Sequence, residues 1–326
     1  MIDIRNATDQ ARGAILGAFI GDASGATLEF LGRKPTRKEV QSAMKMTGGG
    51  VWRTAPGQIT DDGELTLALC HALNDGDKYN PLDVARSYRG WYLSNPFDIG
   101  SATSNALGAG ELDDGDLAAK IQHNAATCNI GSKANGSLMR ATPLGVWSAR
   151  VSMEEAINAA RLDSRLTHPN QSCQWAVAAY VLAIRHLVLH PGDHVGAVLC
   201  ARDSLSCTEA SEVLGWLQDA LDGTLPAFFP MAGFVRIAFT HAMHHLSIAT
   251  NFFEGIDQVL AGGGDTDTNA CIVGGLLGAL HGESGLPVEM RKAVIECDVT
   301  TGRPRPEWLR TRNFFGTSCA NAKFVL

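Results

Sequence analysis

The sequence predicts an all-α fold, built as a single compact domain of many helices. Apolar residues recur at helical spacing along most of the 326-residue chain. Strict alternation of polar and apolar residues over the length of a strand is nearly absent. Glycine and proline separate the apolar segments, as in HPGD at 190–193, and most connections are short. We therefore expect one domain over 1–326, with its core at 11–300 and an irregular C-terminal segment at 301–326.

The first predicted helix covers 11–32, ARGAILGAFIGDASGATLEFLG, which is rich in Ala, Leu and Ile with small residues at close spacing. The chain has 35 glycines, and small residues let helices approach one another or let backbone approach a ligand. The later segments with helical periodicity are, in chain order, 62–73, 81–93, 136–148, 153–163, 171–189, 194–204, 208–221, 234–247, 254–260, 268–281 and 287–296.

The composition argues against several classes of protein. A net charge of −7 argues against a general binder of nucleic-acid backbone, which is normally basic. The polar N-terminus lacks the apolar stretch of a signal peptide, and runs such as AVAAYVLAI at 176–184 are too short to span a bilayer. The eight cysteines are scattered without a CxxC pair, as in reduced proteins of the cytosol. We expect a cytoplasmic monomer that does not bind membranes.

Two adjacent carboxylates, Asp61 and Asp62, stand directly before an apolar helical run in GQITDDGELTLALCHAL, 57–73. Acids near a helix N-terminus interact favourably with the helix dipole, and Thr60 or Asp61 can cap the helix. The alternative is a metal site, in which Thr60, Asp61 and Asp62 supply hard oxygen ligands. This stretch alone favours the cap.

A second acidic cluster, in AGGGDTDTNACIVGGLLGALHG at 261–282, mirrors the first. Glycines lead into Asp265, Thr266, Asp267 and Thr268, and an apolar helix follows. One of the two aspartates can cap this helix, and the other then needs a different role. Two oxygen-rich clusters at helix starts strengthen the metal-site hypothesis.

A third acidic motif, GAFIGDASGATLEF, carries Asp22 and Glu29 among small and apolar residues. A carboxylate in such surroundings is costly unless it is paired, and no Lys or Arg lies between Arg12 and Arg33. The partner must come from elsewhere in the fold or be a cation. If the acids of the three motifs converge, divalent metal would neutralise them, and oxygen ligands favour Mg²⁺, Mn²⁺ or Ca²⁺ over zinc.

Six segments, in order, resemble those of a known family: IGDASGATLEF, PGQITDDGELTLAL, NPFDIG, ANGSLMRATPLG, LTHPN and AGGGDTDTNACIVGGLLGA. The chain resembles the ADP-ribosylglycohydrolases, which include dinitrogenase reductase-activating glycohydrolase and the mammalian ADP-ribosylhydrolases. The resemblance covers roughly 11–282, and TDD and GDTDT are specific as a pair. It implies an all-α fold with two divalent cations, Mg²⁺ or Mn²⁺. It also implies removal of ADP-ribose from modified protein side chains, often arginine.

The resemblance also implies roles for individual residues. The positions that resemble metal ligands are Thr60, Asp61 and Asp62, and then Asp265, Asp267 and Thr268. The positions that resemble substrate-binding residues are Gly100, Ser132, Asn135, Gly136, Ser137, Met139, His168, Gly263 and Gly264. Four of them, within 132–137, fall where the family cradles the diphosphate, and His168 matches a histidine beside the distal ribose.

Three further acids have implied roles. Glu29 resembles an acid that lines or gates the metal centre, and Asp22 resembles the acid of the family's GD motif, with a supporting role. Asp98 matches an aspartate proposed as an acid/base or a guanidinium partner in the arginine-specific branch. Two positions depart from the pattern. Gly63 replaces Thr or Ser, which implies a change in local rigidity, and Lys133 replaces an aromatic residue that can stack on adenine.

The implied reaction cleaves an N-glycosidic bond through a transition state that resembles an oxocarbenium ion. Two metals can hold the vicinal ribose hydroxyls and position a water, with Asp61 or Asp62 as the general base. Asp98 can pair with a guanidinium, which favours an arginine acceptor over serine. The expected partners are an ADP-ribosylated protein and the ADP-ribose product.

Several other hypotheses stay open at this point. The linkage cleaved can be to serine, a nucleic-acid base or a free metabolite, or the chain can bind ADP-ribose without catalysis. A generic dimetal phosphohydrolase would usually add histidine ligands, which the acidic clusters lack. Away from these clusters, Trp52 can either wall the site or simply pack, and packing is favoured. Arg303 and Arg305 are expected to form solvated ion pairs.

Overall fold

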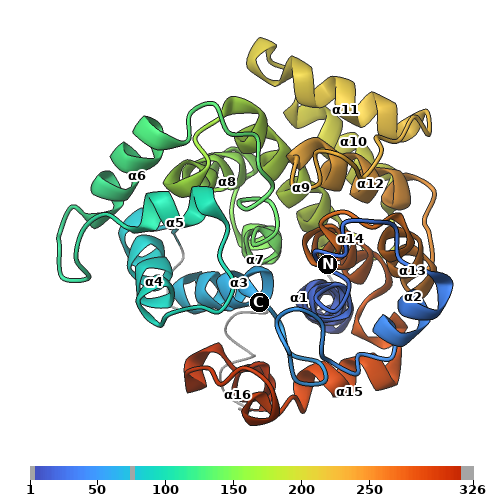
Figure 1. Ribbon diagram of the computed structural model, residues 1–326. Helices are drawn as coiled ribbons and strands as arrows, with labels where there is room; N and C mark the ends of the chain where they lie inside the picture. Colours follow the sequence, from blue (N-terminus) through green and yellow to red (C-terminus); the bar gives the residue numbers. More distant parts are fainter. Residues whose placement is uncertain (1–3, 74–77, 317–326) are drawn as a thin grey trace.

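The computed structural model describes residues 4–73 and 78–316 of the chain. Within these ranges the chain forms helices and no β-sheet, so the predicted all-α class is confirmed (Figure 1). The α-helices are α1 (Ile4–Gly25), α2 (Arg37–Ala43), α3 (Asp61–Leu73), α4 (Pro81–Leu93), α5 (Ser101–Leu107), α6 (Leu117–Cys128), α7 (Thr142–Trp147), α8 (Met153–Thr167), α9 (Gln171–Leu189), α10 (His194–Ser204), α11 (Ser211–Leu221), α12 (Val235–Ser247), α13 (Phe252–Gly262), α14 (Thr266–His281), α15 (Val288–Ile295) and α16 (Thr311–Gly316).

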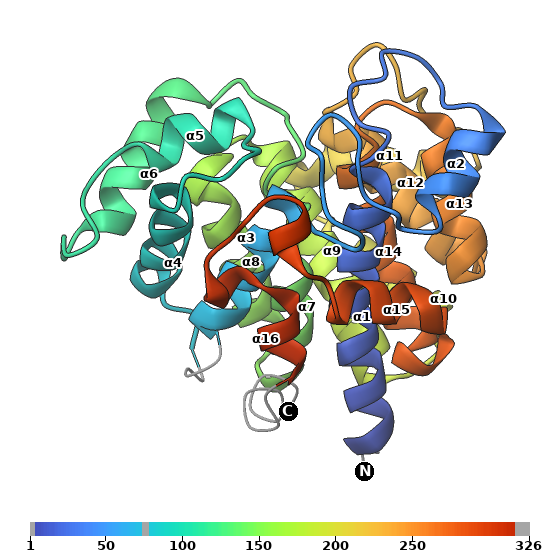
Figure 2. The same cartoon turned by 60° about the horizontal axis from the view of Figure 1, so that its bottom comes forward.

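Helices α1 and α14 pack antiparallel at the centre of the fold (Figure 2). Every fourth residue on the contacting face of α1 is a glycine: Gly13, Gly17, Gly21 and Gly25. A Cβ added to Gly17 would lie 2.2 Å from the carbonyl oxygen of Gly274, so no larger side chain fits there. At the end of this contact, Gly25 lies against the backbone of Asp267. The packing therefore brings the third acidic motif of the sequence beside the second.

Helix α9 forms a large part of the apolar core and packs against α7, α8 and α10. Within the described ranges, it is the one helix whose length and hydropathy would suit a membrane crossing. However, 83% of its apolar window is buried inside the fold, as expected for the core helix of a globular domain.

Two predicted helices have bounds that differ from those expected: α1 lies nearer the N-terminus, at Ile4–Gly25, and α7 is shorter. The helix predicted over 11–32 ends at Gly25, where the chain tightens because the N–H of Leu28 donates to the carbonyl of Gly25. The helix predicted over 136–148 begins only at Thr142, and the turns before it face the pocket described below. In both places, residues with an apolar helical pattern form irregular backbone next to the acidic clusters.

Some elements were not predicted at all, among them the seven-residue helices α2 and α5 and the twelve-residue α6. The segment at 301–326 contains short 3₁₀ turns and α16, and its last ten residues lie outside the described ranges. The described part of this segment runs alongside α3 and α15 (Figure 2).

Candidate active site

A cavity of about 530 Å³ opens where the three acidic motifs meet. This volume is within the usual range for small-molecule sites. Six carboxylates line it: Glu29, Asp61, Asp62, Asp98, Asp265 and Asp267. No Lys or Arg is among the described residues that line it. The structure therefore brings the acids of segments far apart in sequence into one pocket that has no basic side chain in its lining.

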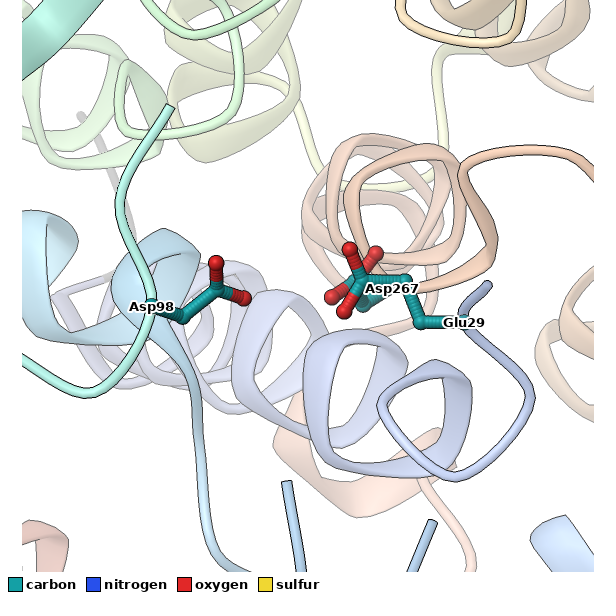
Figure 3. A group of neighbouring side chains, drawn as sticks. All are labelled: Glu29, Asp98 and Asp267. Atoms are coloured by element: carbon teal, nitrogen blue, oxygen red, sulfur yellow. The ribbon is translucent and has the colours of Figure 1, made fainter. Parts of the chain in front are cut away.

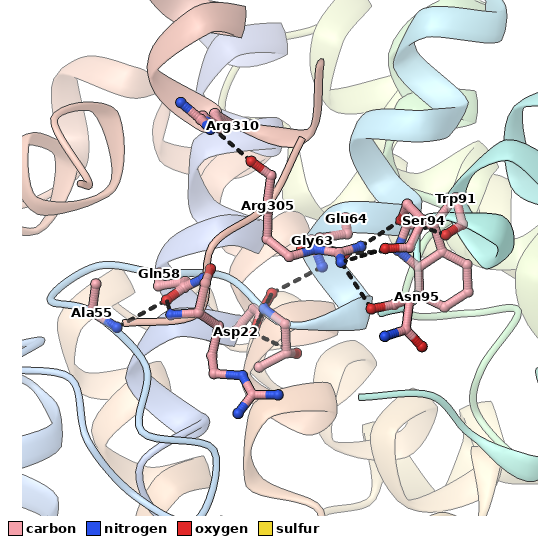
Figure 4. A network of polar contacts seen from close by, with 12 residues as sticks. Asp22, Ala55, Gln58, Gly63, Glu64, Trp91, Ser94, Asn95, Arg305 and Arg310 are labelled. Carbon is pink, nitrogen blue, oxygen red and sulfur yellow. Dashed lines mark hydrogen bonds and ion pairs between the residues drawn. The ribbon is translucent and has the colours of Figure 1, made fainter. Parts of the chain in front are cut away.

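The start of α3 is held by α1 rather than by its own aspartates. The carboxylate of Asp22 accepts hydrogen bonds from the backbone N–H groups of Thr60 and Gly63, each at 2.9 Å, and from the Thr60 hydroxyl (Figure 4). A Cβ on Gly63 would lie 2.7 Å from the Asp22 carboxylate, so a larger residue here would require neighbouring side chains to shift. Because Asp22 binds these N–H groups, Asp61 and Asp62 are available to the pocket.

Asp62 is buried and only partly satisfied. Its Oδ2 atom accepts long hydrogen bonds of 3.4 Å from the hydroxyls of Thr60 and Thr268, which come from the two predicted ligand groups. Its Oδ1 atom has no hydrogen-bond partner among the residues that the structure describes. A buried carboxylate oxygen without a partner is energetically costly. An oxygen-binding cation at this position would satisfy it.

Three of the lining carboxylates are close enough to share a cation. Ligand oxygens of Glu29, Asp98 and Asp267 all lie within 4.8 Å of one another. Figure 3 shows Asp98 approaching from one side and Asp267 with Glu29 from the other. All the donors are oxygen atoms, the ligand type that Mg²⁺, Mn²⁺ and Ca²⁺ prefer. The donor set thus fits a hard divalent cation.

Helix capping does not account for Asp265 or Asp98. Asp265 occupies the N-cap position of α14, but its side chain makes no cap hydrogen bond and instead accepts one from Asn135 Nδ2 at 2.7 Å. The N-cap of α5 is Gly100, without a side-chain hydrogen bond, so Asp98 does not cap that helix. Both carboxylates line the pocket and can bind a cation or a substrate there.

Burial and mutual repulsion strongly perturb these acids. Burial, with added repulsion from neighbouring carboxylates, raises the pKa values of Asp61, Asp62 and Asp267 well above their usual range. Burial and the charge of Asp98 raise the pKa of Glu29 to about 8. Burial and the charge of Asp265 raise the pKa of Asp98 to about 6. A cluster of this kind cannot be fully ionised at neutral pH without a cation.

His168 lines the pocket as a neutral ring. Burial, together with the charge of Arg140, lowers its pKa to about 3. Arg140 donates to the Thr167 hydroxyl at 2.8 Å, and that hydroxyl lies 2.8 Å from His168 Nδ1. Because a guanidinium only donates, the hydroxyl proton of Thr167 is free to bind Nδ1, which leaves the ring proton on Nε2. His168 therefore presents a hydrogen-bond donor to the pocket.

The predicted substrate-binding residues divide into two groups. Besides His168, those that line the pocket are Gly100, Asn135, Gly136, Met139 and Gly264. Those outside its lining are Ser132, Ser137 and Gly263. Ser137 is buried and accepts a hydrogen bond from Ser164. Of the expected diphosphate cradle, Asn135 and Gly136 thus reach the pocket. Lys133 forms an ion pair with Glu212 at 2.7 Å.

The sequence did not reveal three features of the site. Phe229 and Pro230 line the pocket, although neither was predicted to belong to the site. For Trp52, simple packing was favoured over a place in the wall of the site, but its Nε1–H donates to Glu29 at 2.6 Å and so helps to hold an acid of the site. Arg305 was expected to form a solvated ion pair, and this was wrong, because its ion pair with Glu64 is buried.

Known proteins match this chain over most of its length. The family model for ADP-ribosylglycohydrolase matches residues 3–313. The ADP-ribosyl-[dinitrogen reductase] glycohydrolase of Rhodospirillum rubrum is 27% identical, over 86% of this chain and 88% of that protein. The ADP-ribosylarginine hydrolase Tri1 of Pseudomonas putida (strain GB-1) is 30% identical, over 87% of this chain and 73% of that protein.

The solved structures agree with these sequence matches. The structure of an ADP-ribosylglycohydrolase-related protein complex has a TM-score of 0.71 with this chain, is 25% identical to it, and covers 98% of each chain. Its fold and the family match thus extend to every segment that lines the acidic pocket. The chain belongs to the ADP-ribosylglycohydrolase family.

Proposed function

We propose that the chain is a metal-dependent ADP-ribosylarginine hydrolase, which cleaves the N-glycosidic bond between the distal ribose and an arginine side chain. Membership of the family supports a hydrolase that acts on ADP-ribosyl groups. The observation that carries the arginine assignment is Asp98. Its carboxylate lines the pocket, caps no helix and has no basic partner among the described residues. An arginine guanidinium would supply that partner.

The acidic cluster is proposed to hold two divalent cations, Mg²⁺ or Mn²⁺. The residues that would hold them are Thr60, Asp61, Asp62, Asp265, Asp267 and Thr268. Support comes from the unpartnered Asp62 Oδ1 atom and from the all-oxygen donor set. When bound, such cations would supply positive charge to the ribose hydroxyls and to the attacking water.

The carboxylates of the chain would move the protons of the reaction. The bond from the anomeric carbon to the guanidine nitrogen breaks, and a water oxygen bonds to that carbon. Asp61 or Asp62 accepts the proton of the water. Asp98, with its pKa raised to about 6 by burial and by Asp265, can hold a proton near neutral pH and pass it to the departing nitrogen. The products are the free arginine side chain and ADP-ribose.

The opposite wall of the pocket is proposed to bind the ADP-ribosyl group. His168 donates through Nε2–H to an oxygen of the distal ribose or the diphosphate, since its neutral ring has no proton on Nδ1. Asn135 is already oriented by its hydrogen bond to Asp265. Gly136 and Met139 complete this wall. No lining Lys or Arg is present in the described structure to bind phosphate, so uncharged donors must serve.

The decisive experiment compares two defined substrates. An arginine-ADP-ribosylated peptide and a serine-linked one are each incubated with the full chain, once with Mg²⁺ and once with EDTA. We expect release of ADP-ribose from the arginine-linked peptide with Mg²⁺ only. Preferential cleavage of the serine-linked peptide would overturn the acceptor assignment. Tight binding of ADP-ribose without turnover of either peptide would indicate a binding protein instead.

A further inference from the structure

The described end of the chain contains a segment, residues 302–310, that we call the C-terminal strap. Its central residue, Arg305, is buried, with 4% of its side chain exposed. The guanidinium binds both oxygens of Glu64 on α3, through Nε at 2.7 Å and through Nη2 at 2.9 Å. Glu64 follows Asp61 and Asp62 within the first turn of α3. Through Glu64, Arg305 is therefore connected to the turn of α3 that carries Asp61 and Asp62.

The same guanidinium also binds the connection between α4 and α5. Its Nη1 atom donates to the carbonyl oxygens of Ser94 and Asn95, each at 3.1 Å, and Nη2 donates to the Ser94 hydroxyl at 2.7 Å (Figure 4). These two residues begin the loop 94–100, which carries Asp98. Asn95 has a positive φ of 56°, a left-handed conformation that asparagine tolerates better than most residues.

Two neighbouring contacts of the strap act on the same region. Gln58, just before Thr60, exchanges two hydrogen bonds with the backbone of Arg303, at 2.6 and 2.9 Å. The Arg303 guanidinium lies over the ring of Phe97, 5.3 Å from its centre, directly before Asp98. The strap thus contacts the chain next to both Asp61 and Asp98.

We propose that Arg305 is a positioning residue that fixes the Asp98 loop relative to the start of α3, and so sets the distance between Asp98 and the other acids of the pocket. Such positioning is needed because the carboxylates facing Asp98 repel it and so favour its movement outward. Arg305 opposes that movement with hydrogen bonds to two backbone carbonyls. This inference rests on the proposed function, in which Asp98 serves the departing arginine.

A buried ion pair between Arg305 and Glu64 would not, by itself, position the Asp98 loop. Such pairs contribute little net stability over apolar residues of the same size, whereas removing one partner is strongly destabilising. The test therefore removes both charges together, in the pair variant Glu64→Gln/Arg305→Gln. A second variant, Arg305→Lys, retains a cation for Glu64 but cannot span that carboxylate and both carbonyls.

The first readout is a double-mutant cycle with Asp98→Asn, using arginine-linked peptide. We expect the pair variant to lower kcat about ten- to a hundredfold in the normal background. In the Asp98→Asn background, the pair variant should lower kcat by less than about threefold, because the side chain that Arg305 positions has already lost its role. Additive losses would overturn the proposal. An Asp98→Asn variant with full activity would instead refute the role of Asp98 in the proposed function.

The second readout does not depend on activity. Hydrogen exchange of the backbone amides in 94–100 should become faster in the pair variant and in Arg305→Lys, while ADP-ribose affinity changes less than about threefold. Unchanged exchange in both variants would overturn the proposal. Arg185→Gln is the matched control, because Arg185 also binds two loop carbonyls, of Ser148 and Val151, away from the pocket lining. It should leave both readouts unchanged.

Discussion

Asp22 on α1 binds both the backbone N–H and the hydroxyl of Thr60, each at 2.9 Å, and so caps α3 from a different helix. A helix start normally uses a side chain of its own N-cap residue. Here the cap comes from a helix whose position is fixed by its glycine contact with α14. The placement of Asp61 and Asp62 therefore depends on the same packing that places Asp267.

Asp22→Ala should lower the free energy of unfolding by about 1–3 kcal/mol, because two buried N–H groups lose their acceptor. It should also reduce the stabilisation that added Mg²⁺ gives, since the start of α3 is then free to shift. Urea unfolding with and without Mg²⁺ measures both effects. Ser24→Ala, which removes a buried hydrogen bond within the same helix, is the control. Equal effects of the two variants would show that Asp22 does not hold α3.

The sequence predicted several of the longer helices well, although α1 was expected over 11–32 instead of Ile4–Gly25. The bounds predicted for α4, α9 and α10 match the structure, because each has an apolar face and a capping side chain at its start. The seven-residue helices α2 and α5 were missed, since seven residues give too few turns for a period to show, and such helices depend on tertiary packing. Of these two, α5 follows the Asp98 loop. The twelve-residue α6 was missed as well.

The aspartates at the starts of α3 and α14 were noticed because two similar clusters required a common explanation, and their residue types pointed to a cation. Asp98 was singled out only by the resemblance to the family. The supporting residues had no such signal. Arg305 lies in a segment rich in arginine and proline, and its burial depends on Glu64, which is 241 positions away. Phe229 likewise reaches the pocket only through the path of its loop. Long-range contacts of this kind leave no local pattern.

Without metal, the protein should lose stability as the pH rises from about 4 to about 8. Burial raises the pKa of Asp22 to about 7, and burial with the charge of Asp98 raises that of Glu29 to about 8. A carboxyl group with a raised pKa binds its proton more tightly in the folded state, so deprotonation favours unfolding across this window. Thermal unfolding in EDTA at several pH values measures the trend. Adding Mn²⁺ at pH 8 should restore the lost stability. Metal-free stability that rises steadily over this window would contradict the prediction.

Asp267→Asn should abolish turnover while the fold is retained. The carboxylate lies within 4.8 Å of ligand oxygens of Glu29 and Asp98, so losing its charge should weaken cation binding but also relieve repulsion. Peptide hydrolysis and circular dichroism test the two parts. Asp193→Asn is the control, because Asp193 caps α10 outside the pocket lining. Full activity of Asp267→Asn at saturating Mg²⁺ would refute the ligand assignment.

Thr167→Val should release His168 from its single tautomer, because the valine cannot donate to Nδ1. In the unmodified protein, ¹⁵N spectra of His168 should show the proton on Nε2, with no protonation near pH 6.5. The variant should bind ADP-ribose about tenfold less tightly, the value of one lost hydrogen bond. Thr167→Ser should restore both properties. A proton on Nδ1 in the unmodified protein would refute the proposed donor role.

Asp98→Ala should reduce hydrolysis of the arginine-linked peptide strongly while changing ADP-ribose binding much less, because the product carries no guanidinium. Loss of a charge-assisted hydrogen bond alone corresponds to about 1.5–3 kcal/mol, or roughly ten- to a hundredfold. Loss of proton donation to the departing nitrogen would add a further factor of about 10²–10⁴. The size of the loss in kcat therefore separates positioning from proton transfer.

Asp98→Asn refines this comparison. An amide oxygen can still accept a hydrogen bond from the guanidinium, but an amide cannot supply a proton to the leaving group. If Asp98 only positions the substrate, the asparagine variant should retain more activity than the alanine variant. If Asp98 donates the proton, the two variants should be similarly inactive, and the activity of the unmodified protein should fall as the pH rises above about 6, where Asp98 loses its proton. Full activity of both variants would remove the structural basis for an arginine acceptor.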